Sequence, residues 1–432
     1  MKSDKELGFW MSTALVVGNV IGMGIFMLPA SLAPYGYTAL AGWGITVLGM
    51  AVLARVFARL AREFPNADGP YVYIRENVGD APAFLAIWCY WVSLWVTNAA
   101  LAIGVVGYFV AVFPALQSVS PAVLALSMIW LFVGVCLFGA RMGGGVQILT
   151  TVLKLLPMVA IILLGLWVFL AEPSAYTRSP PTSTWTLKDL MAASTIALYA
   201  MLGIESATIP AGRVKDPERT IPRATLAGTF LTAAIYVAVS AIAISLIPQD
   251  QLAKSSAPFV DLLDRYMGHA NGRWLALFVV VSGLGALNGW TLLVGELTSS
   301  MAAHGVMPRS LGKLNRHGAP AIALIVTAVL ASAMVLMNYS KSLVEGFTFL
   351  TLVVTAANLP LYFFCAIALA VYWKKGGRAA STDMLVLGVI GTLYSVFAFI
   401  GIGKEPFVWS LVLAAAGLPL YLWMRARHGR SP

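Results

Sequence analysis

Apolar residues dominate this chain in long, nearly continuous runs separated by short polar segments. Many runs extend over 18 residues or more, the length that a helix needs to cross the hydrocarbon core of a bilayer. A membrane β-barrel would show short segments of alternating polarity instead. The pattern therefore predicts an all-α integral membrane protein with about twelve transmembrane helices, at residues 10–33, 38–63, 82–112, 122–139, 146–171, 187–210, 223–247, 274–304, 319–337, 343–372, 382–402 and 406–425.

Composition leads to the same class of protein. Of the 432 residues, 59% are hydrophobic and 11% are charged, whereas soluble domains have about 45–50% apolar and about 25% charged residues. The helices leave no room for a sizeable soluble domain, so residues 1–432 are interpreted as a single transmembrane domain. The three cysteines lie in apolar stretches without CxxC spacing and the four histidines lie in loops or at helix ends, so no metal site and no cofactor are expected.

Positive residues are distributed unevenly between the two sides of the predicted bundle. An even number of helices puts both termini on one side. If that side is the inner one, twenty of the 28 Lys and Arg residues lie in inner segments. The positive-inside rule therefore predicts cytoplasmic termini. The net charge of +10 then reflects orientation in the bilayer, and no nucleic-acid partner is expected.

Two predicted helices contain helix-breaking residues near the middle of the membrane. Residues 18–26 read GNVIGMGIF, with Pro29 following, and residues 199–206 read YAMLGIES, with Pro210 following. Irregular backbone at this depth is tolerated only where it is buried or lines a cavity. Interrupted helices at corresponding positions of two halves predict a transporter substrate site. A close-packing glycine face is the alternative explanation of the first break.

Three charged residues fall inside predicted helices, and each is a functional candidate because charge is costly there. Glu205 follows the second break, where its carboxyl group could hold a cationic substrate or a proton, or tie the broken backbone together. Lys154 and Glu296 lie at similar depths and could pair. Lys154 could also replace a bound sodium ion as a fixed cation, carry a proton, or snorkel to the inner headgroups.

The sequence contains no recognisable catalytic machinery. It has no HExxH motif, no P-loop and no aspartate cluster. An intramembrane enzyme is therefore the weaker alternative, and the protein is not expected to be an enzyme. A pore is harder to exclude, but broken helices at mid-membrane favour alternating access.

Five segments together resemble the amino acid–polyamine–organocation superfamily: residues 18–26 (GNVIGMGIF), 65–73 (PNADGPYVY), 203–207 (GIESA), 214–222 (VKDPERTIP) and 289–293 (GWTLL). Within it, the chain resembles the bacterial basic amino acid/polyamine antiporter family, which includes arginine/agmatine and putrescine/ornithine exchangers. The resemblance implies a leucine-transporter-type fold of 5+5 inverted repeats, about 10–171 and 187–372, with two additional helices at about 382–425. It also implies a multi-pass protein of the cell inner (plasma) membrane, and it leaves a homodimer open.

The resemblance also implies roles for individual residues. Substrate-binding positions carried over at the two breaks are Asn19, Val20, Gly22, Met23, Gly24, Tyr199 and Leu202, and those around the distal end of the substrate are Asn98, Trp290 and Thr351. Glu205 matches a proton-sensing acid and Tyr71 matches a tyrosine linked to pH gating. Tyr90, Lys154 and Glu296 complete the set of proton-coupling or gating candidates.

Several positions depart from the arginine/agmatine pattern. Met23 stands where that group usually has a serine, Tyr199 replaces a tryptophan and Leu94 replaces a cysteine. Gln147, Lys154 and the leucines after it are instead similar to helix 5 of sodium-independent L-type exchangers and proton-coupled symporters, whose lysine occupies the space of a sodium ion. We therefore expect a sodium-independent antiporter of a cationic amino acid or polyamine, with protons as an open coupling partner. The alternative is a proton-coupled amino acid symporter of broader or neutral specificity.

Overall fold

The computed structural model describes residues 8–64, 69–138, 153–203, 217–376 and 381–428. All regular secondary structure in these ranges is helical. The helices that match the predicted spans are α1 (Phe9–Val20), α2 (Gly24–Leu32), α3 (Thr38–Glu63), α5 (Asp80–Val112), α6 (Pro121–Leu137), α8 (Leu155–Ala171), α9 (Leu187–Met201), α10 (Pro217–Leu246), α13 (His269–Ala303), α14 (Ala321–Met337), α15 (Leu343–Lys374), α16 (Thr382–Gly401), α17 (Lys404–Ala415) and α18 (Leu418–His428).

The predicted all-α membrane fold is confirmed in the part of the chain that the structure describes. Seven helices there are long and apolar enough to cross a membrane, and four shorter apolar helices accompany them. Every predicted range contains a helix, and the first prediction divides into α1 and α2 as the glycine pattern indicated. Residues 146–152 of the fifth predicted helix and 204–210 of the sixth lie outside the described residues.

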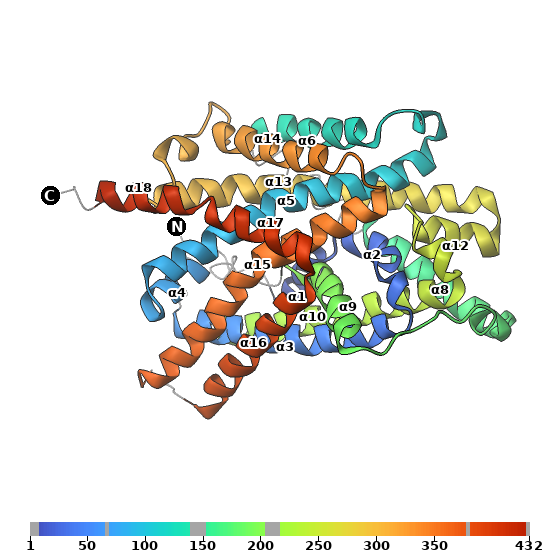
Figure 1. Cartoon of the computed structure of the whole chain (residues 1–432), viewed down its shortest axis with the longest axis horizontal. Helices are drawn as coiled ribbons and strands as arrows, with labels where there is room; N and C mark the ends of the chain where they lie inside the picture. The colour runs from blue at the N-terminus through green and yellow to red at the C-terminus, as the bar shows by residue number, and fades with distance from the viewer. Residues whose placement is uncertain (1–7, 65–68, 139–152, 204–216, 377–380, 429–432) are drawn as a thin grey trace.

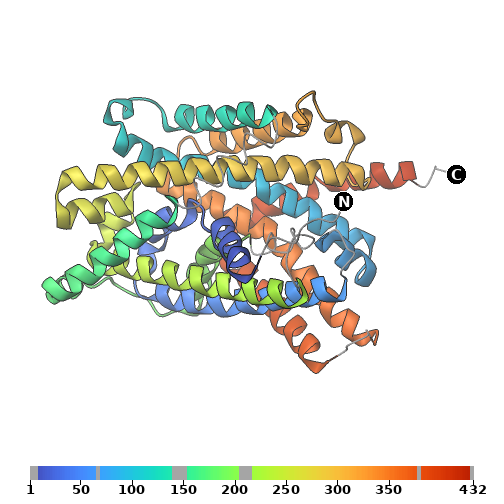
Figure 2. The ribbon, with the colours of Figure 1, turned by 180° about the vertical axis from the view of Figure 1, so that it is seen from behind.

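The helices pack around a buried centre that contains α1, α2 and α5. Helix α15 packs along α5 and α16, and α13 packs along the other side of α5 (Figure 1). Helices α6 and α14 lie together on one outer face in both views, while α3 and α10 lie on the opposite side (Figure 2). An apolar 18-residue stretch of Asp80–Val112 is 83% buried, whereas the corresponding stretch of Lys404–Ala426 is only 11% buried. An apolar helix that remains this exposed is suited to face lipid.

Several helical features were not predicted. Helix α4 (Pro70–Asn77) follows α3, and α11 (Gln249–Leu252) and α12 (Pro258–Met267) lie between α10 and α13. The last predicted helix divides into α17 and α18 at residues 416–417. Gly417 is needed at this bend because a Cβ atom there would lie 2.7 Å from the ring of Trp88, whose indole N–H donates to the Leu413 carbonyl oxygen over 2.9 Å.

Candidate functional site

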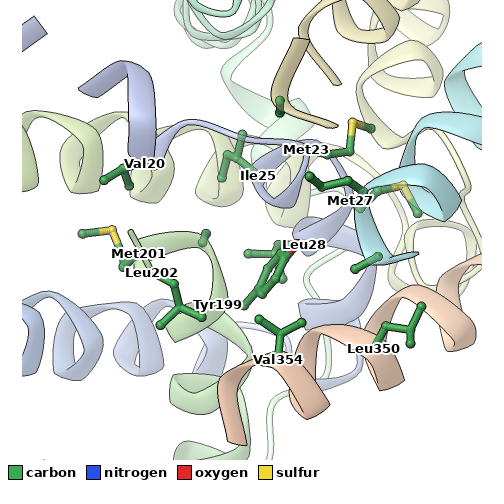
Figure 3. Packing of buried hydrophobic residues seen from close by; sticks show 14 of the residues in the cluster. Val20, Met23, Ile25, Met27, Leu28, Tyr199, Met201, Leu202, Leu350 and Val354 are labelled. Carbon is green, nitrogen blue, oxygen red and sulfur yellow. The ribbon is translucent and has the colours of Figure 1, made fainter. Parts of the chain in front are cut away.

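The first transmembrane helix is interrupted between Val20, where α1 ends, and Gly24, where α2 begins (Figure 3). Ile21 has an extended backbone, with φ −72° and ψ 104°, and its N–H bonds back to the Val17 carbonyl oxygen over 2.9 Å. A helix end leaves up to four backbone groups without an intrahelical partner. The break therefore brings the carbonyl end of α1 and the N–H end of α2 together inside the bundle, and the two ends carry opposite partial charges.

Two side chains from other helices bind the carbonyl oxygens at the end of α1. Lys154, which caps the start of α8, donates from Nζ to the Gly18 oxygen over 3.1 Å. Tyr236 on α10 donates from its hydroxyl to the Val20 oxygen over 3.1 Å. The Lys154 side chain is only 2% exposed, which excludes snorkelling to the headgroups. A buried ammonium group at the negative end of a helix is electrostatically favourable.

Lys154 and Glu296 do not form the pair that the sequence left open. No ion pair joins these two described residues, because Lys154 turns inward to α1 while Glu296 lies on an exposed face of α13. The positive charge of Lys154 is therefore compensated by backbone carbonyl dipoles in this structure, without a carboxylate from α13.

The second break follows α9. Leu202 has an extended backbone with ψ 152°, and Gly203 has φ +102°, a conformation that glycine adopts without the steric strain of a Cβ atom. Glu205 lies outside the described residues, so its place at the site stays a prediction. The two breaks approach closely: a Cβ atom on Gly24 would lie 3.0 Å from Cε1 of Tyr199. Tyr199 also packs edge-to-face on Phe347 of α15, with ring centroids 5.9 Å apart.

A small cavity of about 30 Å³ lies between the two breaks. Its lining residues come from seven helices and from both breaks: Val20, Gly22, Met23, Gly24, Ser93, Thr97, Leu101, Tyr199, Ala200, Leu202, Tyr236, Trp290, Val354 and Asn358. Figure 3 shows part of this region, with Tyr199 between Met23 of the first break and Val354 of α15. Because all the lining side chains are uncharged, the described part of the cavity offers aromatic rings, hydroxyl groups, an amide and exposed backbone.

Seven of the ten predicted substrate-binding residues line this cavity: Val20, Gly22, Met23, Gly24, Tyr199, Leu202 and Trp290. The side chain of Asn19 lies outside the described set. Asn98 and Thr351 are buried but are not among the lining residues. The Thr351 hydroxyl bonds within its own helix, to the Thr348 carbonyl oxygen over 2.9 Å.

The spacing of helical faces explains the difference at Asn98. Ser93, Thr97 and Leu101 line the cavity from α5, and residues four apart share one face of a helix. Asn98 is one residue off this face. Thr351 lies on nearly the same face of α15 as Val354 and Asn358, and its hydroxyl group bonds within its own helix. The predicted residues on α5 and α15 came from the resemblance, which pointed to Asn98 and Thr351 and left out Ser93 and Asn358.

The predicted gating tyrosines lie in different environments. Tyr71 is half-buried on α4, with the Arg75 guanidinium 5.6 Å from the centre of its ring. Partial burial raises the pKa of Tyr71, and the neighbouring Arg75 charge opposes that change. Tyr90 is buried on α5 and its carbonyl oxygen accepts the Ser93 hydroxyl over 2.7 Å. Neither tyrosine lines the cavity, so a gating role for them stays a prediction.

The architecture has a counterpart among solved structures. A substrate-bound, outward-open Na⁺-coupled sialic acid symporter superposes with a TM-score of 0.54, covering 92% of this chain and 90% of that chain at 13% sequence identity. A likeness at this identity concerns the fold alone. It supports the predicted leucine-transporter-type architecture, while the division into repeats at 10–171 and 187–372 stays a prediction.

Sequence relatives extend over nearly the whole chain. A protein provisionally named an arginine/ornithine antiporter in Bacillus subtilis is 33% identical, covering 93% of this chain and 92% of its own. The putrescine transporter PotE of Haemophilus influenzae is 30% identical over 97% of both chains. A cadaverine/lysine antiporter of Escherichia coli is 28% identical, covering 100% of this chain and 97% of its own. The amino acid permease family model matches residues 7–422, and the chain therefore belongs to the amino acid permease family.

Proposed function

We propose that this protein is a sodium-independent secondary transporter that exchanges a cationic amino acid or a polyamine across a bacterial plasma membrane. The observation that carries the proposal is the cavity between the two helix breaks, in a chain whose relatives are named as arginine/ornithine, putrescine and cadaverine/lysine transporters. These relatives are transporters rather than enzymes, and the reaction proposed here is movement of an unmodified substrate.

The chemistry of the cavity fits a substrate with a carboxylate and one or more amines. The N-terminus of α2 at Gly24 supplies N–H groups and a positive dipole end, which suit a carboxylate. Tyr199 and Trp290 supply aromatic faces, which attract ammonium and guanidinium groups through cation–π interaction. Glu205, two residues beyond Gly203, is proposed to hold a proton or the cationic group of the substrate.

Lys154 supports the absence of sodium coupling. Its ammonium group already supplies a buried positive charge to the end of α1, 3.1 Å from the Gly18 oxygen. A sodium ion coordinated by the same carbonyl oxygens would meet electrostatic repulsion from that ammonium group. We propose that the Lys154 ammonium group stabilises the carbonyl end of α1 in place of a bound cation.

The orientation and assembly of the protein extend the proposal. Multiple apolar helices support a multi-pass membrane protein, and the inner excess of Lys and Arg supports cytoplasmic termini. A homodimer remains part of the proposal, to be tested by light scattering on the detergent-solubilised protein.

One alternative is favoured by a specific observation. The lining side chains in the described part of the cavity are uncharged, which suits a neutral amino acid, and Lys154 could then carry the coupled proton. A proton-coupled symporter would accumulate neutral amino acids in empty vesicles when an inward proton gradient is imposed.

Counterflow in proteoliposomes tests the proposal. Vesicles loaded with unlabelled ornithine or putrescine should take up the labelled compound much faster than empty vesicles, and replacing sodium by choline should leave the rate unchanged. Equal uptake by empty vesicles would contradict exchange. In the same assay, Glu205→Gln should change either the pH response or the affinity for a cationic substrate, and unchanged values of both would remove Glu205 from the mechanism.

A further inference from the structure

Asn358 of α15 carries an amide near the middle of this largely apolar helix, and it lines the cavity described above. Its side chain is 2% exposed. Its Nδ2 group donates to the Ser93 hydroxyl oxygen over 3.4 Å. Its Oδ1 atom is buried without a hydrogen-bond partner, an arrangement that costs stability unless a ligand or water supplies a donor.

The Ser93 hydroxyl fixes which end of the amide is available. Ser93 donates its one hydroxyl hydrogen to the Tyr90 carbonyl oxygen over 2.7 Å. It can therefore only accept from Asn358, so the atom facing Ser93 must be the amide nitrogen. The carbonyl end of Asn358 is left as the free group. The hydrogen-bond network therefore identifies which end of the amide is the oxygen.

A second acceptor lies on the same face of α5. The Thr97 hydroxyl donates within its helix to the Ser93 carbonyl oxygen over 2.7 Å, which leaves its lone pairs as the remaining hydrogen-bonding capacity. Thr97 also lines the cavity. The Asn358 Oδ1 atom and the Thr97 hydroxyl oxygen are therefore two available acceptors facing the cavity, and a group with several N–H donors can bond to both.

We propose that Asn358 is a specificity-determining residue that accepts a hydrogen bond from the amine or guanidinium group at the end of the substrate remote from its carboxylate. This inference rests on the proposed function, because it assumes that a cationic amino acid or polyamine enters the cavity. The N–H groups at the start of α2 suit the carboxylate of the substrate. The α-amine is attached to the neighbouring carbon, so it would lie beside the same break. Asn358, on a separate helix and paired to α5, is available for the distal end.

Pairs of ligands that differ only in the distal group test the inference. Lysine and norleucine share the backbone groups and chain length, and only lysine has the terminal amine; ornithine and norvaline form a second pair. Binding to the purified full-length protein is measured as competition against a labelled substrate. Asn358→Leu should weaken the binding of lysine or ornithine by roughly 10- to 100-fold, the range for a hydrogen bond to a charged group. The affinities for norleucine and norvaline should stay within about twofold of the wild-type values.

Two further variants separate recognition from folding. Asn358→Asp keeps the shape and the acceptor, and it should retain or strengthen the preference for the distal amine. Ser93→Ala removes the partner that orients the amide, so it should reduce the lysine-to-norleucine ratio less than Asn358→Leu does. An unchanged ratio in Asn358→Leu, or equal weakening of both members of a pair, would overturn the inference. Failure of the proposed function is distinguishable, since the wild-type protein would then bind the cationic member of neither pair.

Discussion

Lys154 and Gly18 are 136 residues apart in the sequence, yet the Lys154 ammonium donates to the Gly18 carbonyl oxygen over 3.1 Å in the buried centre of the protein. The contact joins the start of α8 to the last turn of α1. Since the helix is interrupted after Val20, α1 is held in place partly by hydrogen bonds from other helices.

Replacing Lys154 should therefore affect both stability and transport. Lys154→Met has a similar length but leaves the buried Gly18 oxygen without a donor, which costs about 1–3 kcal/mol. We expect a lower melting temperature in detergent and strongly reduced counterflow. Lys154→Gln retains a hydrogen-bond donor without the charge. Compared with Lys154→Met, it should restore much of the melting temperature but little of the counterflow. Full activity in both variants would contradict a role for the charge.

The Tyr236 hydroxyl should matter for transport in the same way. It donates to the Val20 oxygen over 3.1 Å at the edge of the cavity, and Tyr236→Phe should destabilise by about 1–2 kcal/mol and reduce exchange. Tyr176→Phe is a matched control, because the Tyr176 hydroxyl donates to the Gly165 oxygen over 2.8 Å away from the cavity. Equal effects of both variants on exchange would contradict a specific role for Tyr236.

Much of the fold could be predicted because transmembrane helices are specified locally. Bilayer thickness sets the length of each apolar run, and glycines reduce helix stability wherever they cluster. Residues 38–63 were predicted as a helix and form α3 with the same bounds. The bend at Gly417 was not predicted, because it depends on Trp88 of α5 packing from a distant part of the chain.

The candidate site was predictable where it consists of backbone and less so where it consists of side chains. The two breaks were identified from glycine and proline positions, and the resemblance then assigned Val20, Gly22, Met23, Gly24 and Leu202 to substrate binding. Tyr236, Ser93 and Asn358 were missed because their importance depends on which helices are neighbours, and a single sequence does not contain that information. Lys154 was identified as unusual, but its partner is a carbonyl oxygen, which every residue has and no sequence pattern marks.

Alkaline titration should report the docking of α4 against the bundle. Tyr73 is 4% exposed on α4, and burial, with a smaller contribution from Cys365, raises its pKa to about 12. Because the unfolded chain loses this proton near its ordinary value of 10.0, the stabilising contribution is complete below that pH. It is lost progressively as the pH rises to the folded value.

Tyr73→Phe should therefore flatten the fall in melting temperature between about pH 10 and pH 12 while leaving stability at neutral pH nearly unchanged. Tyr71→Phe, on the same helix but half-buried, should flatten it less. An unchanged alkaline profile in Tyr73→Phe would indicate that α4 is not packed against the bundle in solution.

The close approach of the two breaks gives the last prediction. An alanine at Gly24 would put a Cβ atom 3.0 Å from Cε1 and 3.2 Å from Cδ1 of Tyr199. The ring has little freedom to withdraw because it packs on Phe347. Overpacking of this kind costs about 1–3 kcal/mol, partly offset by the better helix propensity of alanine.

Because the displaced ring lines the cavity, Gly24→Ala should raise the KM of exchange more than it lowers the melting temperature. Gly44→Ala, two turns into α3, is the control, since a Cβ atom there meets nothing within 4 Å. It should leave exchange unchanged and raise stability by roughly 0.5–1 kcal/mol. An unchanged KM in Gly24→Ala would mean that substrate binding does not depend on the position of Tyr199. That result would contradict the assignment of the cavity between the breaks as the substrate site.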